Sequence, residues 1–135
     1  MNKKNGINIK DKTDQLKASA YFGLLSETKR HIRDGAKINY KFDGGITPFM
    51  FAVNGGCLKT IKYLTDNGAD VNIQTADGQS PLMIAVLRKR LDIVKHLILS
   101  KAVVSAKNKS GETALSLSIK YSTKTIEKFL TNKGE

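Results

Sequence analysis

A spacing of 33 residues recurs along this chain and constrains its fold more strongly than any local pattern. Three strings that open on a hydroxyl residue begin at this interval: Thr47-Pro48-Phe49, Ser80-Pro81-Leu82 and Thr113-Ala114-Leu115. Two further series keep the same interval: Gly35, Gly68, Lys101 and Gly134, and then Asn39, Asn72 and Ser105. Units of this size cannot bury their apolar faces alone and must stack on their neighbours. The chain is therefore predicted to be a linear array of small units.

The opening strings predict where the first helix of a unit begins. The hydroxyls of Thr47 and Ser80 can accept hydrogen bonds from the free N–H groups at a helix start. Pro48 and Pro81 follow in the first turn, where a proline loses no hydrogen bond. The short apolar run at residues 49–53 then indicates a helix that is buried on most sides.

A second, amphipathic helix is expected in each unit. In the second unit it follows the break at Gly56, and Gly68, which tolerates positive φ, ends it. Residues 76–79 and 109–112 have the composition of turns. Hairpin-like tips are therefore expected to join one helix pair to the next.

The residues from 45 to 72 carry a specific resemblance. They contain the following motifs in order: Gly-x-Thr-Pro, Ala52-Val53, Gly56, Tyr63-Leu64 and Gly68-Ala69-Asp70-Val71-Asn72. This segment resembles an ankyrin repeat, and the resemblance extends over about residues 14–135. It implies an all-α fold, an ankyrin-repeat solenoid of about four stacked helix-turn-helix units with hairpin-like loops.

The same resemblance gives the expected domain organisation: an N-terminal tail, residues 1–13, and a single ankyrin-repeat domain, residues 14–135, with units at about 14–41, 42–74, 75–107 and 108–135. The end units are expected to act as caps, because a repeat array needs polar outer faces. Residues 26–33 of the first unit are polar, so its second helix is expected to face water. In the last unit these residues are expected to face inward: Leu115, Leu117, Ile119, Ile126, Phe129 and Leu130. We therefore expect one complete domain rather than a fragment of a longer array.

Two lysines stand where the repeat pattern has glycine. Lys89 and Lys101 replace these glycines in the third unit. Either the backbone avoids positive φ at these positions, or each lysine costs about 1 kcal/mol of stability.

The charge is strongly positive. The 135 residues include 23 Lys and Arg against 12 Asp and Glu, a formal net charge of +11. Such a chain favours acidic partners or polyanions. Because only 4 of the basic residues are Arg, whose fork-shaped guanidinium group dominates phosphate and base recognition, nucleic acid is the less favoured partner. The dense run Arg88-Lys89-Arg90 is a candidate contact, although lysines spread along a stack often serve only solubility.

The sequence contains no catalytic or metal-binding constellation, so we predict a protein that is not an enzyme and has no metal or cofactor. His31 and His96 lie on different second helices without Cys or carboxylate at ligand spacing, and both are expected on helix surfaces. Cys57 is the only cysteine, so no disulfide can form within the chain. A half-buried thiol without a role is the expected state of Cys57.

Targeting signals are not recognisable. The charged start of the chain is not followed by an apolar run, and no segment is long and apolar enough to span a membrane. We expect a cytoplasmic monomer without membrane contact; an exported protein whose signal has been removed would have the same sequence.

By resemblance, ankyrin stacks bind partner proteins on the concave face, through the loop tips and the ends of the first helices. The tips supply Phe42, Asp43, Ile46, Ala76, Asp77, Gln79, Lys109 and Glu112. The first-helix ends supply Tyr21, Phe22, Asn54, Leu87, Arg88, Lys120 and Tyr121. The expected anchors are Tyr21, Phe42, Arg88 and Tyr121, because aromatic and Arg side chains are enriched at interface centres. In the alternative, Phe22, Ile46 and Leu87 only pack against the next unit, and Asp43 and Asp77 only stabilise turns.

The leading hypothesis is a non-catalytic protein–protein interaction module. It would hold, inhibit or scaffold a partner with an acidic patch through its concave face. The first alternative is a scaffold for a polyanion or nucleic acid, which would act through the Lys-rich ends of the chain. The second alternative is a detached regulatory domain of an enzyme.

Overall fold

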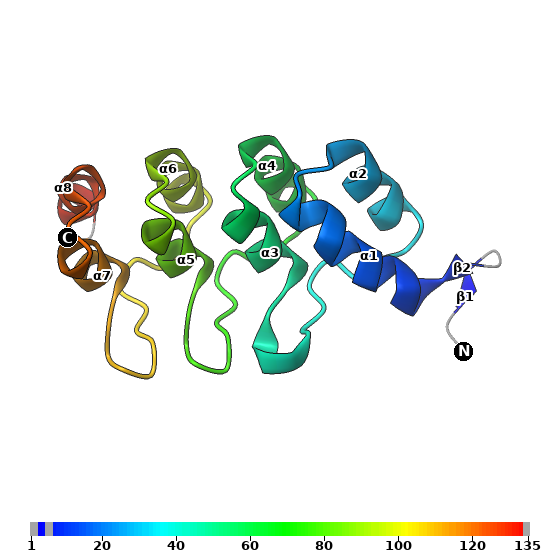
Figure 1. Cartoon of the computed structure of the whole chain (residues 1–135), viewed down its shortest axis with the longest axis horizontal. Helices are drawn as coiled ribbons and strands as arrows, with labels where there is room; N and C mark the ends of the chain where they lie inside the picture. The colour runs from blue at the N-terminus through cyan, green and yellow to red at the C-terminus, as the bar shows by residue number, and fades with distance from the viewer. Residues whose placement is uncertain (1–2, 5–6, 134–135) are drawn as a thin grey trace. The chain divides into compact units, whose positions relative to one another are not determined.

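The computed structural model describes residues 3–4 and 7–133, and within them helices form consecutive antiparallel pairs (Figure 1). The chain divides into two compact units, Met1–Asp70 and Val71–Glu135. The first contains β1 (Lys3–Lys4), β2 (Ile7–Asn8), α1 (Ile9–Tyr21), α2 (Leu25–Arg33), a short 3-10 turn (Asp43–Gly45), α3 (Pro48–Gly55) and α4 (Leu58–Asp66). The second contains α5 (Pro81–Leu87), α6 (Leu91–Leu99), α7 (Ala114–Lys120) and α8 (Lys124–Lys133). Two helices per repeat, as predicted, are thus present in all four repeats.

Hydroxyl caps begin the first helices of the last three repeats, as the sequence predicts. In each, the side-chain oxygen accepts a hydrogen bond from the backbone N–H three residues later: Thr47 from Met50 at 3.3 Å, Ser80 from Met83 at 3.2 Å, and Thr113 from Ser116 at 3.1 Å. Thr113 also donates its backbone N–H to the Ser116 hydroxyl at 2.8 Å, which completes a reciprocal capping box. Local side-chain chemistry therefore sets these boundaries.

The core of the first unit lies between α1, α3 and their second helices. Helix α1 packs against α2 and α3, and α2 packs against α4. Gly55 lies against the end of α1, so a Cβ there would overlap the carbonyl oxygen of Tyr21. These apolar residues of the first unit are almost fully buried: Leu16, Ala20, Phe49, Met50, Ala52, Val53, Ile61 and Leu64. Small residues in the first helices let their backbones approach closely.

The second unit repeats this arrangement. Helix α5 packs against α6 and α7, and α8 packs against α7 and α6. Its buried apolar residues are Val71, Leu82, Met83, Ala85, Val86, Ile93, Val94, Leu97, Ala114, Leu117, Ile126 and Leu130. A Cβ at Gly78 would approach within 2.7 Å of the Asn108 Cα, so the two tips of this unit lie against each other.

Two asparagines at the repeat interval make equivalent contacts, one in each unit. In the first unit, the Asn39 amide donates to the Gly68 carbonyl at 2.9 Å and accepts from the Asp70 N–H at 2.8 Å. In the second, Asn72 donates to the Lys101 carbonyl at 3.1 Å and accepts from the Val103 N–H at 2.8 Å. Each asparagine therefore ties one repeat to the backbone of the next. We refer to these contacts as the asparagine clasps.

Three details differ from expectation. Helix α1 begins at Ile9, inside the segment assigned to the N-terminal tail, because the Asn8 side chain caps it by accepting from the Lys10 N–H at 3.0 Å. Ile119 is 55% exposed instead of facing inward, because Leu117 and Ser118 occupy the buried side of the last turn of α7. His31 is buried rather than on a helix surface, because α1 covers this side of α2.

Lys89 and Lys101 adopt positive φ, at 59° and 72°. The alternative in which the backbone avoids this region is therefore wrong. Ser122, one repeat after Lys89, has the same conformation with a φ of 58°. The left-handed turn belongs to the repeat geometry, because Gly23 and Gly56 also have positive φ at this interval, and it carries a cost in strain where the residue is not glycine.

Replacing Lys101 by glycine should stabilise the protein. Lys101→Gly removes the strained side chain and keeps the carbonyl that Asn72 binds, so we expect the free energy of unfolding to rise by about 0.5–1 kcal/mol. Urea unfolding measures the change. As the control, Lys62→Gly in the exposed face of α4 should lower the free energy of unfolding by about 1 kcal/mol. Equal destabilisation by both substitutions would contradict the strain at Lys101.

The buried His31 should make stability dependent on pH. It is 4% exposed and its Nδ1 has no hydrogen-bond partner. Burial, followed by the nearby cations Lys12 and Arg30, lowers the pKa of His31 below its ordinary value of 6.5. The unfolded chain therefore takes up a proton at a higher pH than the folded chain. The contribution of His31 to stability is complete above pH 6.5 and is lost as the pH falls toward the lowered pKa.

We expect a smaller free energy of unfolding at pH 5.5 than at pH 7.5. In His31→Gln this difference should shrink, because glutamine does not titrate. Ser26→Gln, at an exposed position on the same helix α2, is the control and should leave the difference unchanged, because neither serine nor glutamine titrates in this range. Urea unfolding of the three proteins at both pH values measures the effect; the same pH dependence in His31→Gln and in the parent would exclude His31 as its source.

Candidate protein-binding surfaces

A hollow of about 370 Å³ opens in the first unit between α1, the tip segment and α3. We call it the aromatic groove; its lining residues are Lys10, Asp14, Lys17, Tyr40, Phe42, Asp43, Ile46 and Phe51. A smaller hollow of about 150 Å³ adjoins it and shares Lys10, Asp14 and Tyr40. Both are open to solvent, so the groove is a surface that a partner can reach.

Aromatic rings form one side of the aromatic groove. The ring centroids of Tyr40 and Phe42 are 4.9 Å apart and those of Phe42 and Phe51 are 6.0 Å apart, both in edge-to-face geometry. This arrangement places the positive edge of one ring on the negative face of the next. The Lys17 ammonium lies 4.6 Å from the Phe42 ring centroid and 5.9 Å from that of Phe51. The groove therefore combines apolar surface with a cation held on ring faces.

The backbone of the tip places these side chains. The Phe42 N–H donates to the Ile46 carbonyl at 2.8 Å, and the Gly45 N–H donates to the Phe42 carbonyl at 2.9 Å. Gly44 and Gly45 supply the positive φ values, 80° and 76°, that close this turn. The turn brings Phe42 and Ile46 to the same hollow.

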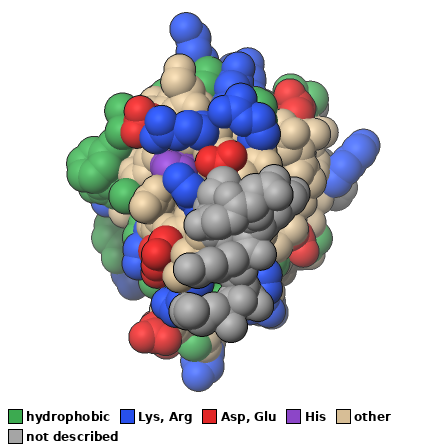
Figure 2. Space-filling view, turned by 90° about the vertical axis from the view of Figure 1, so that its right-hand side faces the viewer, with side chains coloured by type: hydrophobic (Ala, Val, Ile, Leu, Met, Phe, Trp, Pro, Cys, Tyr) green, Lys and Arg blue, Asp and Glu red, His purple; other side chains and the backbone are tan. Residues whose placement is uncertain are grey.

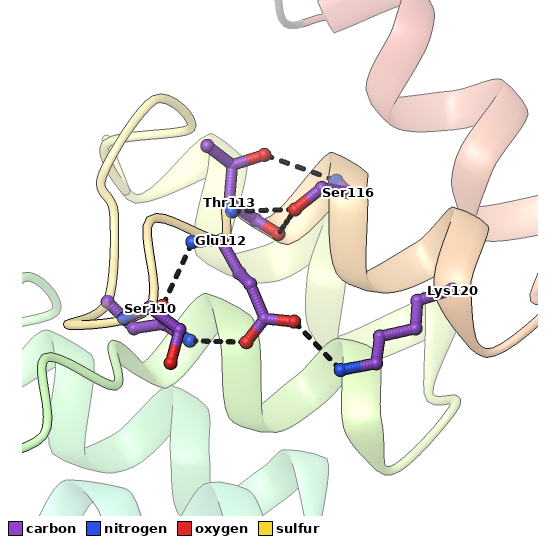
Figure 3. Close-up of polar contacts among 6 residues, drawn as sticks. Ser110, Glu112, Thr113, Ser116 and Lys120 are labelled. Carbon is purple, nitrogen blue, oxygen red and sulfur yellow. Dashed lines mark hydrogen bonds and ion pairs between the residues drawn. The ribbon is translucent and has the colours of Figure 1, made fainter.

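In the second unit, Glu112 links the last tip to helix α7 (Figure 3). Its carboxylate accepts from the Asn108 amide at 3.0 Å through Oε1 and from the Lys120 ammonium at 3.0 Å through Oε2. The Asn108 side-chain oxygen in turn accepts from the backbone N–H groups of Ser110 and Glu112. These bonds hold the tip in one conformation beside the C-terminal end of α7.

Glu112 and Lys120 each stabilise the charged form of the other. The hydrogen bond from Asn108, followed by that from Lys120, lowers the pKa of Glu112. The hydrogen bond to Glu112 raises the pKa of Lys120. Both groups are therefore fully ionised at neutral pH, and the Lys120 ammonium lies 5.5 Å from the Tyr121 ring centroid.

The earlier tip of the second unit is fixed by backbone contacts. The Lys109 N–H donates to the Asp77 carbonyl at 2.9 Å, and the Gln74 amide donates to the carbonyls of Gly78 and Lys107. The Gln79 side-chain oxygen is buried and has no hydrogen-bond partner. Asp77 and Lys109 are exposed, so their side chains are accessible at the tips.

The predicted contact residues fall into separate places. Phe42, Asp43 and Ile46 lie together in the aromatic groove. Glu112, Lys120 and Tyr121 lie together at the last tip, while Leu87 and Arg88 are exposed at the end of α5. Asn54 is half-buried in α3.

Phe22 lies apart from the aromatic groove. It is 70% exposed and lines another hollow, of about 260 Å³, with Leu24, Arg30 and His31. Its ring centroid is 5.0 Å from that of the half-buried Tyr21. Figure 2 shows a face on which a histidine is recessed between basic and hydrophobic side chains.

Five residues of the aromatic groove escaped sequence reasoning: Lys10, Asp14, Lys17, Tyr40 and Phe51. The spacing of Lys10, Asp14 and Lys17 is that of one helix face, which is the signal that could have found them. Lys10 lies before the first residues that match the repeat, so the repeat interval alone does not place it on this helix face.

Paired helices joined by projecting tips define a helical repeat protein. A family model described as ankyrin repeats, in three copies, matches residues 16–108. The chain belongs to the ankyrin-repeat family, and the predicted fold class, an all-α ankyrin-repeat solenoid, is confirmed. None of the curated proteins matches the chain. Ankyrin repeats are generally protein–protein interaction modules and are typically not catalytic.

Within residues 3–4 and 7–133, no group of three or more His, Cys, Asp or Glu side chains is placed to hold a metal ion. In the same part of the chain, no helix has both the length and the apolar character needed to cross a membrane. Cys57 is half-buried before α4, and hydrogen bonds from Thr60 lower the pKa of its thiol.

The Glu112 link should control the mobility of the last tip. Glu112→Gln removes the charge that Lys120 binds, so we expect the pKa of Lys120 to fall and the amides of residues 108–113 to exchange faster with solvent. Two-dimensional NMR of labelled protein measures both. Glu127→Gln, which removes the ion pair between the half-buried Glu127 and the exposed Lys124 in α8, is the control and should change neither. Unchanged exchange at 108–113 in Glu112→Gln would mean that the backbone alone fixes the tip.

Proposed function

We propose that this protein is a non-catalytic binding module that holds a partner protein with an acidic patch through its tips and first-helix ends. Its effect on the partner would be inhibition or scaffolding. The observation that carries the proposal is the aromatic groove, where Phe42, Ile46 and Phe51 offer apolar surface. Lys17 lines the same groove, and its ammonium lies on the aromatic rings.

The composition of these surfaces supports a protein partner. Protein interfaces are enriched in aromatic residues and Arg, which bury large areas at their centres. Tyr40 and Phe42 in the first unit and Arg88 and Tyr121 in the second are residues of these types and are at least partly exposed. The hydrogen bonds that fix the tips reduce the ordering cost of binding, which favours affinity.

The net charge of +11 supports an acidic partner. Long-range attraction would accelerate the encounter, and the aromatic contacts would then slow dissociation. Because the aromatic contacts and not the charges would hold the complex together, we expect binding to weaken only moderately as salt is added. Binding to a polyanion alone would instead fall steeply with salt.

Affinity capture from a lysate of the source organism tests this function. The parent is compared with the triple variant Tyr21→Ala, Phe42→Ala and Tyr121→Ala, after circular dichroism shows that both are folded. The control carries Lys62→Ala, Leu99→Ala and Lys128→Ala, at exposed positions on second helices. We expect one captured protein to bind the triple variant about tenfold or more weakly and the control equally well. Capture dominated by nucleic acid, equal in all three proteins and eluted by salt, would overturn the proposal.

A further inference from the structure

Lys17 is held over aromatic rings instead of in an ion pair. Its ammonium lies over Phe42 and Phe51 at 4.6 and 5.9 Å from the ring centroids, and its side chain is half-buried in the middle of α1. Within the described part of the chain no carboxylate lies within ion-pair distance of it. Ring faces attract a cation but do not neutralise it. Lys17 therefore presents a full positive charge to the aromatic groove.

The aromatic groove is lined by two lysines and two aspartates, and the adjoining hollow adds Lys37, so the two hollows together carry one excess positive charge. Lys10 pairs with Asp14 at 3.5 Å across one turn of α1, so these two charges largely cancel. Lys37 lines the adjoining hollow, and Asp43 is exposed at the tip. The excess charge of both hollows is positive and is nearest to the rings at Lys17.

The groove also selects by shape and polarity. Phe42, Ile46 and Phe51 are half-buried and leave apolar surface along the hollow. Its volume of about 370 Å³ suits the side chains of a short segment. A cationic side chain entering there would meet the Lys17 ammonium already on the ring faces. An anion next to an apolar side chain would meet complementary groups at both positions.

We propose that the aromatic groove receives a short acidic segment of the partner, in which an apolar side chain packs on Phe42 and Phe51 and a neighbouring carboxylate pairs with Lys17. This inference rests on the proposed function and assigns the chemistry of the partner segment. Lys17 is the specificity-determining residue. Pairing with a carboxylate in a groove partly shielded from water is stronger than the same pair on an open surface.

Model peptides test this assignment. The probes are three labelled ten-residue peptides of equal length: one with alternating Asp and Leu, one with alternating Asp and Ser, and one with alternating Lys and Leu. Fluorescence anisotropy gives their affinities, and NMR of isotope-labelled protein locates the site. We expect the Asp-Leu peptide to bind about fivefold or more tightly than either other peptide and to shift the amides of residues 40–51.

Substitutions at Lys17 separate charge from packing. Lys17→Met keeps the apolar stem and should weaken binding of the Asp-Leu peptide about fivefold or more, whereas Lys17→Arg should retain it. Lys95→Met is the matched control, because the Lys95 ammonium lies 5.7 Å from the Phe129 ring centroid in the other unit. It should leave binding unchanged. Circular dichroism and urea unfolding establish that all variants are folded.

Three results would overturn the assignment: tighter binding of the Lys-Leu peptide, equal binding to Lys17→Met and the parent, or no shifts at residues 40–51 up to about 1 mM peptide. The proposed function is judged separately by capture. The captured partner could fail to bind the triple variant and yet bind Lys17→Met with the same affinity as the parent. That result would support the proposed function and exclude an acidic segment as the occupant of the aromatic groove.

Discussion

The structure depends on the burial of apolar surface that no single pair of helices can cover by itself. Helix α3 is almost wholly apolar, and Phe49, Met50, Ala52 and Val53 are buried against its neighbours in the first unit. Each repeat must therefore place its apolar residues at positions equivalent to those of its neighbours. This requirement explains why equivalent residues recur at a strict interval along the sequence. The exposed side chains at the tips, such as those of Asp77 and Lys109, lie outside this requirement and can vary without weakening the core.

The helix boundaries that could be predicted from the sequence are those set by hydrogen bonds between residues close together in the chain. Thr47, Ser80 and Thr113 cap their helices within three residues, so local chemistry is sufficient. The early start of α1 depends on the Asn8 cap, a common residue whose signal is weak outside the repeat frame. The burial of His31 depends on how α1 covers α2, and the polarity of the residue gave no indication of it.

The residues of the candidate site also fall into those that the sequence predicts and those that it does not. Phe42, Asp43 and Ile46 were predictable because they follow from the position of a tip in the repeat. The aromatic groove as a whole was not predictable, because it forms only where the rotation of α1 about its own axis places Lys17 over the Phe42 ring. Its chemistry arises from a helix face and a loop that meet only in the folded unit.

The asparagine clasps bind backbone atoms of the following repeat. Asn39 contacts the carbonyl of Gly68 and the N–H of Asp70, while Asn72 makes the same contacts with Lys101 and a valine. Every residue other than proline carries both of these backbone groups, so the contacts themselves call for no particular side chain at the positions that they hold. A joint of this kind makes neighbouring modules interchangeable. Duplication or exchange of a repeat would preserve the connection as long as the asparagine stays in frame, so the array can lengthen while its surfaces diverge.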